Sequence, residues 1–252
     1  MNIRMIVLGI SMFVILYFLY KFLLGNPVTK PINLRYDPQI TPVNYSGLSV
    51  PNSTRYCYYI WVHANVIDST SENIFQVTDK AYKEKPDKSK NPTGKLFSLD
   101  IVNNTNLQVT VLTNTNTSGT GTYTLNQFLI TPNFPIQSWQ QIIVSFDNTY
   151  MDLYLNGKFV KSVQFNNATG TNTLGIPVQT SVNTNINYGV MANDKSPDID
   201  VRLFNRYEYS MDPQTAWNKY KSDKNIGDGA STNYGLKLNL STNNKLQSYP
   251  IF

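Results

Sequence analysis

The chain has one cysteine, Cys57, and one histidine, His63, among its 252 residues. A single thiol cannot form an intramolecular disulfide, and one Cys with one His cannot supply the clustered ligands of the usual zinc sites. We therefore expect no structural metal and no cofactor, and we expect both residues to lie in the core or in strands. A lone thiol is also more typical of a reducing compartment, or of a virion assembled in one.

Charged residues are also few, at 15% of the chain, and the formal net charge of +5 is unevenly distributed. The stretch YKEKPDKSKNPTGK, residues 82–95, carries five lysines against Glu84 and Asp87 and supplies net +3 by itself. Its two prolines and its lack of apolar periodicity are typical of a solvated loop, whereas a nucleic-acid groove interleaves basic and aromatic residues. The sequence therefore predicts no nucleic-acid partner.

The amino terminus contains a long apolar run. Residues 5–20, MIVLGISMFVILYFLY, carry no charge, and KFLL extends the run to about 20 residues, the length that a bilayer core requires. Leu23 and Leu24 precede Gly25, so the small residues of a cleavage site are missing. We expect residues 1–25 to form an uncleaved single-pass transmembrane helix, with the lipid bilayer as a partner and a membrane as the location.

Residues 26–54 contain five prolines, at positions 27, 31, 38, 42 and 51. Proline at this density removes hydrogen-bond donors and stiffens the chain, which predicts an extended stalk between the anchor and a folded domain. The other interpretation is that part of this segment supplies a first edge strand.

Residues 55–222 have the pattern of an all-β domain, an antiparallel β-sandwich. Ile142, Val144 and Phe146 alternate with polar residues, and the run after Tyr150 alternates in the same way. Asn156-Gly157 stands between that run and the next, and this pair supplies the positive φ angles of a type I′ hairpin turn. Further strand patterns are RYCYYIWVHANVI, GKLFSLDIV and NLQVTVLTN.

In this region the chain resembles the concanavalin A-like lectin/glucanase superfamily in its laminin-G-like form. The resemblance is carried by Trp139, IVSFD, MDLYLNGK over residues 151–158, and IDVRLFNRYEYSMDPQTAWNKY over residues 199–220. It implies a jelly roll in which Trp139, Asn156, Gly157 and Trp217 have structural roles. In the closing segment, we expect strand residues Val201 and Leu203 to alternate with Arg202 and Phe204, and Ser210 to cap a short helix that leans Trp217 and Tyr220 on the sandwich.

Glycoside hydrolases with this fold use two carboxylates on one strand, and the chain has no counterpart of that pattern. Its only glutamates, Glu72, Glu84 and Glu208, are isolated, and we expect them on loops or at the surface. Asp198 and Asp200 are neighbours on one strand face but occupy positions of structural aspartates in the resembled family. We therefore expect no catalytic residue and no enzyme. Oxygen ligands for calcium remain open at Asp147, Asn148 and Asp152, beside their interpretation as surface turn residues.

Two functions remain open. The first is a non-catalytic structural protein, because an Asn- and Thr-rich chain with an uncleaved anchor resembles the membrane-anchored minor capsid proteins of large double-stranded DNA viruses. In that case it links an internal membrane to a protein shell, and its partners are other capsid proteins. The second is a membrane-anchored lectin-like module that binds glycans, since tyrosine is abundant and aromatic faces stack on sugars.

The last part of the chain, residues 223–252, lies beyond the resemblance. In YGLKLNL, residues 234–240, leucines alternate with polar residues, and the chain then ends in the apolar YPIF. This pattern predicts one strand with a buried face. The strand either folds back on its own sandwich or completes the sheet of a neighbouring protein.

Overall fold

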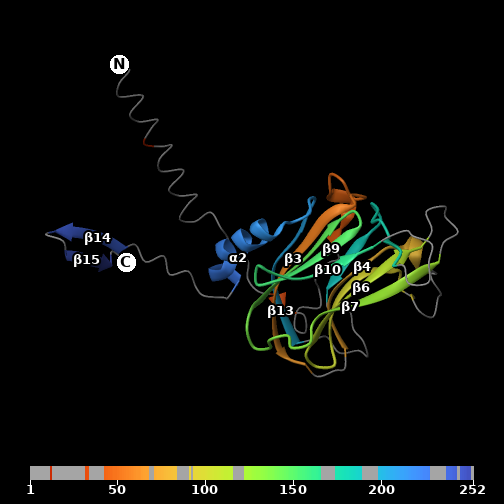
Figure 1. Cartoon of the computed structure of the whole chain (residues 1–252), viewed down its shortest axis with the longest axis horizontal. Coiled ribbons are helices and arrows are strands. Elements are labelled where there is room, and N and C mark those ends of the chain that lie inside the picture. Colours follow the sequence, from red (N-terminus) through yellow and green to blue (C-terminus); the bar gives the residue numbers. More distant parts are fainter. Residues whose placement is uncertain are drawn as a thin grey trace, which may run out of the picture. The chain divides into compact units, whose positions relative to one another are not determined.

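The chain forms two sheets that enclose one apolar core (Figure 1). The computed structural model describes Met12, Ile32–Asn33, and residues 43–67, 71–83, 91, 93–115, 122–165, 174–188, 198–227, 237–242 and 245–250. Contacts divide the chain into a unit of residues 1–30 and a unit of residues 31–252. The predicted anchor, residues 1–25, lies outside the described residues apart from Met12, and no described helix combines the length and apolarity needed to cross a membrane.

The first sheet has six strands and the second has seven, and every described pairing is antiparallel. In spatial order the six-stranded sheet consists of β1 (Ile32–Asn33), β13 (Asp198–Tyr207), β3 (Arg55–Val66), β8 (Gln140–Asp147), β9 (Tyr150–Leu155) and β10 (Lys158–Gln164). The seven-stranded sheet consists of β11 (Ile176–Pro177), β6 (Asn106–Asn114), β5 (Lys95–Val102), β4 (Ser71–Thr78), β12 (Asn185–Tyr188) and β2 (Val43–Asn44), with β7 (Tyr123–Thr131) paired to β6. The predicted all-β antiparallel sandwich is confirmed.

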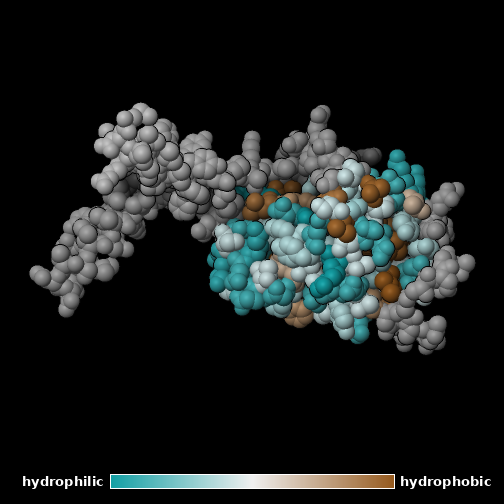
Figure 2. All heavy atoms as spheres, turned by 90° about the horizontal axis from the view of Figure 1, so that it is seen from above, coloured by the Kyte–Doolittle hydropathy of each residue, from teal (hydrophilic) through white to brown (hydrophobic). Residues whose placement is uncertain are grey.

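Side chains of β3 alternate between two apolar clusters, as a strand with both faces covered requires. Tyr58, Ile60 and Val62 point into the core between the sheets, whereas Tyr59 and Trp61 belong to a cluster on the outer face. Figure 2 shows a face of the molecule on which hydrophilic residues predominate among the described residues and hydrophobic ones are scattered.

A helix, α2 (Pro213–Gly227), covers part of that outer face. Its Tyr220 ring stacks on Trp61 at 5.8 Å between ring centroids, and Trp217 stacks on Tyr220 at 5.6 Å. Tyr59 donates a hydrogen bond from its hydroxyl to Asp223, with an oxygen–oxygen distance of 2.7 Å. Trp217 keeps 37% of its surface exposed, so it lies at the rim of this contact.

The predicted hairpin turn lies under α2. Asn156 and Gly157 connect β9 to β10 with φ angles of 51° and 71°, the positive values that an Asn-Gly turn adopts. A Cβ on Gly157 would lie 2.7 Å from Tyr220 Cβ and 3.0 Å from Trp217 Cε3. Glycine is therefore required here both by the turn and by the close approach of the helix.

Part of the segment predicted as a stalk belongs to the sandwich. Within residues 26–54, β1 pairs with β13 and β2 pairs with β12, so this segment supplies an edge strand to each sheet. Tyr45 follows β2 in the short helix η1 (Tyr45–Gly47); it is fully buried, and its hydroxyl lies 2.5 Å from that of Tyr58. The edge-strand interpretation holds for these described residues.

The predicted alternation along β13 is wrong after Arg202. Leu203 has a φ angle of 48°, and the pairing with β3 shifts between Arg202 and Asn205. This bulge inserts residues without a cross-strand partner. As a result Phe204 packs on the same inner core as Val201, while Leu203 packs on the outer cluster.

The predicted helix cap is also wrong. Asp212, and not Ser210, caps α2: its Oδ1 accepts hydrogen bonds from the backbone N–H groups of Gln214 and Thr215, at 2.9 and 3.0 Å. Pro213 suits the first helical position because it has no backbone N–H that would need a partner. Asp212, directly before it, therefore accepts from the N–H groups of the next two residues, Gln214 and Thr215.

The tail forms a hairpin where one strand was predicted. β14 (Lys237–Thr242) pairs with β15 (Lys245–Pro250) in a sheet of their own. A second short 3-10 helix, η2 (Lys80–Tyr82), leads into the predicted basic loop, of which residues 84–90 and 92 lie outside the described residues.

Candidate binding site on the outer face of the six-stranded sheet

Beyond the part covered by α2, the outer face of β3 and β13 carries a cluster of polar and aromatic side chains around Trp139. Trp139 directly precedes β8 and packs against the outer apolar cluster. Its ring lies 5.4 Å from the His63 ring, measured between centroids, and the Arg202 guanidinium lies 4.4 Å from its centroid. The register that pairs Asp200 with His63 and Arg202 with Trp61 brings these residues together.

Two carboxylates complete this cluster, which we call the Trp139 cluster: His63, Asn65, Trp139, Asp198, Asp200 and Arg202. The Asn65 side-chain amide donates to Asp198 and to Asp200, both at 3.1 Å. The predicted same-face placement of these aspartates is confirmed. Asn65 can reach both because the register between β3 and β13 shifts at Asp198, which leaves Asn65 without a direct partner on β13.

The charges of the cluster lie close to one another and are partly exposed. His63 Nδ1 lies 3.9 Å from Asp200 Oδ2, and the two side chains are 22% and 24% exposed. Partial burial lowers the pKa of Arg202, and the nearby Asp200 carboxylate opposes that shift. The guanidinium remains a cation because the ordinary pKa of arginine lies far above neutrality.

This arrangement is suited to recognition of a polar ligand. It offers carboxylate acceptors, amide and guanidinium donors and part of an indole surface within one patch, and such combinations contact sugars and polar peptides. Both aspartates accept hydrogen bonds from the same amide, whereas the two carboxyl groups of a glycosidase flank the bond that is cut.

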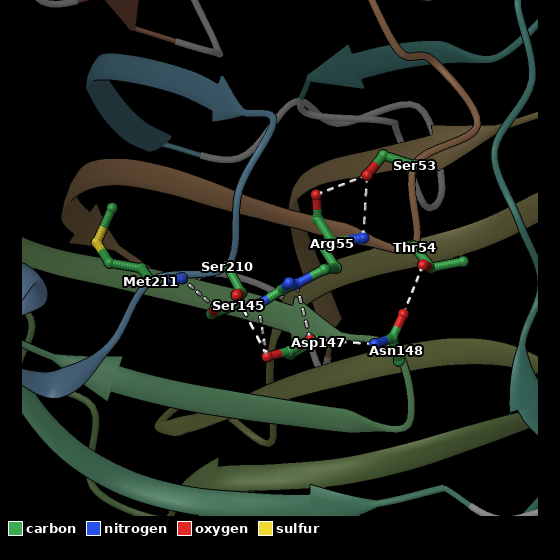
Figure 3. Close-up of polar contacts among 8 residues, drawn as sticks. All are labelled: Ser53, Thr54, Arg55, Ser145, Asp147, Asn148, Ser210 and Met211. Atoms are coloured by element: carbon green, nitrogen blue, oxygen red, sulfur yellow. Dashed lines mark hydrogen bonds and ion pairs between the residues drawn. The ribbon is translucent and has the colours of Figure 1, made fainter.

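The side-chain oxygens considered for calcium, on Asp147, Asn148 and Asp152, bond to other groups of the protein, and Figure 3 shows the contacts of Asp147 and Asn148. The Asp147 carboxylate lies 3.0 Å from Arg55 Nε and accepts from Arg55 Nη2 at 3.3 Å, while Asn148 Oδ1 accepts from Thr54 Oγ1 at 2.7 Å. Asp152 accepts from a serine hydroxyl at 2.5 Å. Among the described residues, no group of three or more His, Cys, Asp or Glu side chains could hold a metal ion.

The other acidic side chains also have partners within the fold. Glu208 accepts from the Val50 backbone N–H at 2.8 Å, and Asp100 accepts from Asn73 and Ser98 at 2.7 and 2.6 Å. Glu72 was expected on a loop or at the surface, but it lies in β4 and is only 5% exposed. A bulge between Asn73 and Phe75 accompanies this placement. Glu84 lies outside the described residues.

The family model of the concanavalin A-like lectin/glucanases superfamily, in its laminin-G form, matches residues 40–186, more than half of the chain. The chain belongs to this superfamily. The match includes the Asn156-Gly157 hairpin and Trp139, while β13 and α2 follow the matched residues. No curated protein sequence matches the chain.

Solved structures with a similar fold include binding domains of botulinum neurotoxins. The receptor-binding domain of the mosaic serotype C/D toxin has 12% identity and a TM-score of 0.49, with 81% of this chain and 49% of that chain covered. The serotype D domain in complex with N-acetylneuraminic acid has 15% identity and a TM-score of 0.46, with coverage of 68% and 38%. The serotype DC domain in complex with rat synaptotagmin II has 13% identity and a TM-score of 0.45, with 67% of this chain and 36% of that chain covered. The chain thus spans half or less of the length of these domains.

Sequence reasoning identified Trp139 and the aspartate pair but not the cluster they form. His63 and Arg202 are about 140 positions apart in sequence, and only the pairing of β3 with β13 places both beside Trp139. The available signal was the alternation of polar residues at positions 63, 65, 198, 200 and 202, all of which point to the outer face.

Proposed function

We propose that the chain is a non-catalytic structural protein, tethered to a bilayer by residues 1–25, whose jelly roll binds other proteins. Its location would be a virion, where it would link an internal membrane to a protein shell as a minor capsid protein. The uncharged run of residues 5–20 supports the tether, and the β-sandwich supplies the protein-binding body.

The observation that carries the non-catalytic assignment is the state of the carboxylates. The described aspartates accept hydrogen bonds or form ion pairs that stabilise the fold. Asp147 pairs with Arg55, Asp212 accepts from the first backbone N–H groups of α2, and Asp223 accepts from the Tyr59 hydroxyl. A carboxylate engaged in this way has its oxygens occupied by donors of the protein, whereas acid–base catalysis needs a carboxyl group that can reach and exchange a proton with a substrate.

Fractionation of purified particles and of host membranes tests this function. The full chain is expected in the fraction that contains both membrane and shell and to resist salt extraction, whereas a variant lacking residues 1–25 is expected to be lost from the membrane. A matched control that replaces residues 5–20 with another uncharged apolar sequence should restore attachment. Recovery of the full chain only in the soluble, particle-free fraction would contradict the proposal.

A second candidate function is glycan recognition at the Trp139 cluster, favoured by the indole, carboxylates and guanidinium gathered there. On a glycan array the full chain would bind one class of sugar, and Trp139→Ala or Asp200→Asn would lose at least tenfold in affinity. Val160→Ala, on the exposed edge of β10, is the control and should bind as the parent does. An array without specific binding would remove this candidate and leave the structural one.

A further inference from the structure

β7 has a long free edge whose described bulge lies at its carboxyl end, where Ile130 is the extra residue between the pairs Leu107–Thr131 and Gln108–Leu129. Natural sandwiches blunt such edges with short strands, lysines, prolines or bulges, because exposed backbone donors and acceptors recruit other strands. Three of the described edge strands, β1, β2 and β11, have only two residues each. β7 has nine residues, YTLNQFLIT, without a charge or a proline.

The edge of β10 is protected along its length, whereas on β7 the bulge and the lysine contact are confined to Leu129 and Ile130. Lys158 and Lys161 are exposed on it, and its pairing with β9 shifts between Phe159 and Lys161, which marks a bulge at Val160. Lysines and a bulge together hinder the approach of a further strand. The β10 edge, in the six-stranded sheet, is therefore charged, whereas the β7 edge, in the seven-stranded sheet, has no charged residue.

One contact shows which way the backbone of β7 faces. Lys161 Nζ donates to the backbone carbonyl of Leu129, at 3.3 Å, across the gap between the edges of the two sheets. This carbonyl consequently points away from β6, and since backbone groups alternate along an antiparallel strand, those of Gln127 and Leu125 point the same way. Gln127 is exposed, and Leu129 is 41% exposed. β7 thus has about six residues available for pairing beyond the Lys161 contact.

The same chain contains a strand pair with open edges. β14 and β15 have six residues each and pair with each other, and no described strand of the sandwich pairs with either (Figure 1). An isolated two-stranded hairpin is marginally stable in water and needs a third strand or a packing surface. In sequence, β14 alternates Leu238 and Leu240 with polar residues, as expected of a strand with one face to bury.

We infer that the β14–β15 hairpin of one copy adds to the free edge of β7 in a second copy, with β14 as the pairing strand. β14 is favoured over β15 because Pro250 lacks a backbone donor. The lengths agree, since six residues of β14 fit the available part of β7, and neither edge presents a cluster of like charge to the other. The contact joins two different surfaces, so it can repeat from copy to copy.

Cross-linking of the full chain in detergent tests this inference. Two chains are prepared separately, one with Gln127→Cys and one with Asn239→Cys, then mixed and treated with a short bismaleimide. Native Cys57 is buried, and burial raises its pKa to about 12, so it does not compete for the reagent. The mixture is expected to give a cross-linked dimer. A mixture with Lys158→Cys, on the β10 edge, in place of Gln127→Cys should give at least tenfold less.

A second measurement uses Gln127→Lys, which gives β7 the kind of charge that β10 carries. This variant should lose self-association in light scattering while keeping its melting temperature, and Asn133→Lys, exposed in the turn after β7, should behave as the parent. Equal cross-linking at both edges, no cross-linked dimer from the mixture of Gln127→Cys and Asn239→Cys chains, a monomeric parent, or unaltered association of Gln127→Lys would each overturn the inference. The inference rests on the proposed structural function. If the full chain is found in the membrane and shell fraction but gives no cross-link, the docking is overturned and the structural function is not.

Discussion

Substitution of Gly157 by alanine tests how tightly the β9–β10 turn and α2 depend on each other. The backbone at this position has a φ angle of 71°, which costs an L-residue with a Cβ about 1 to 2 kcal/mol. The new Cβ would also approach Tyr220 Cβ to 2.7 Å and Trp217 Cα to 3.1 Å, and overpacking of this kind costs about 1 to 3 kcal/mol. We expect Gly157→Ala to lower the free energy of unfolding by about 2 to 5 kcal/mol, or the melting temperature by about 4 to 20 °C.

Asn104→Ala provides the matched control for the backbone contribution. Asn104 also has a positive φ angle, 69°, and is exposed in the turn between β5 and β6. It should cost about 1 kcal/mol or less, because Asn104 already carries a Cβ in this conformation and the change removes only the preference of asparagine for it. Urea unfolding followed by tryptophan fluorescence measures both variants. If Gly157→Ala costs no more than Asn104→Ala, α2 does not rest on the turn and the packing argument fails.

Three further outcomes follow from the described contacts. Asp212→Ala should lower the melting temperature at neutral pH. Hydrogen bonds from Thr215 lower the pKa of Asp212, so its stabilisation is present above the ordinary Asp range and is lost as pH falls through the lowered pKa. A difference between variant and parent that does not shrink with falling pH would contradict the cap. Arg55→Ala should cost less than about 1 kcal/mol in urea unfolding, because its ion pair with Asp147 is exposed, and a larger loss would show a role beyond that pair. Cys57 should resist a thiol reagent at pH 8 until denaturant is added, since burial raises its pKa to about 12, and rapid labelling of the folded chain would contradict its burial.

Local features of this fold could be predicted from sequence because they depend on neighbouring residues. The Asn156-Gly157 turn follows from the φ preferences of two residues, and the alternation of Ile142, Val144 and Phe146 follows from strand geometry. The edge strands β1 and β2 could not be assigned, because two-residue pairings leave no periodic pattern.

Features that depend on distant partners were predicted incorrectly or missed. The bulge at Leu203 reverses the side-chain direction of Phe204, and nothing in the local pattern of β13 reveals it. The Trp139 cluster needs the register of β3 against β13, which is set by the whole sandwich. The hairpin in the tail was missed because residues 245–250 alternate less clearly than residues 237–242.

The way the chain enters the sandwich determines how a mechanical load would reach it. Any pull on the chain ahead of Ile32 acts first on β1, which is held by only two residue pairs to β13, and then on β2, which is held by two to β12. Tyr45 follows directly, fully buried and hydrogen-bonded through its hydroxyl to Tyr58 of β3. Short edge strands peel one pair at a time, whereas withdrawal of Tyr45 must expose an aromatic ring and a buried hydroxyl together. The molecule is therefore built to yield gradually under low force and to resist abruptly at Tyr45.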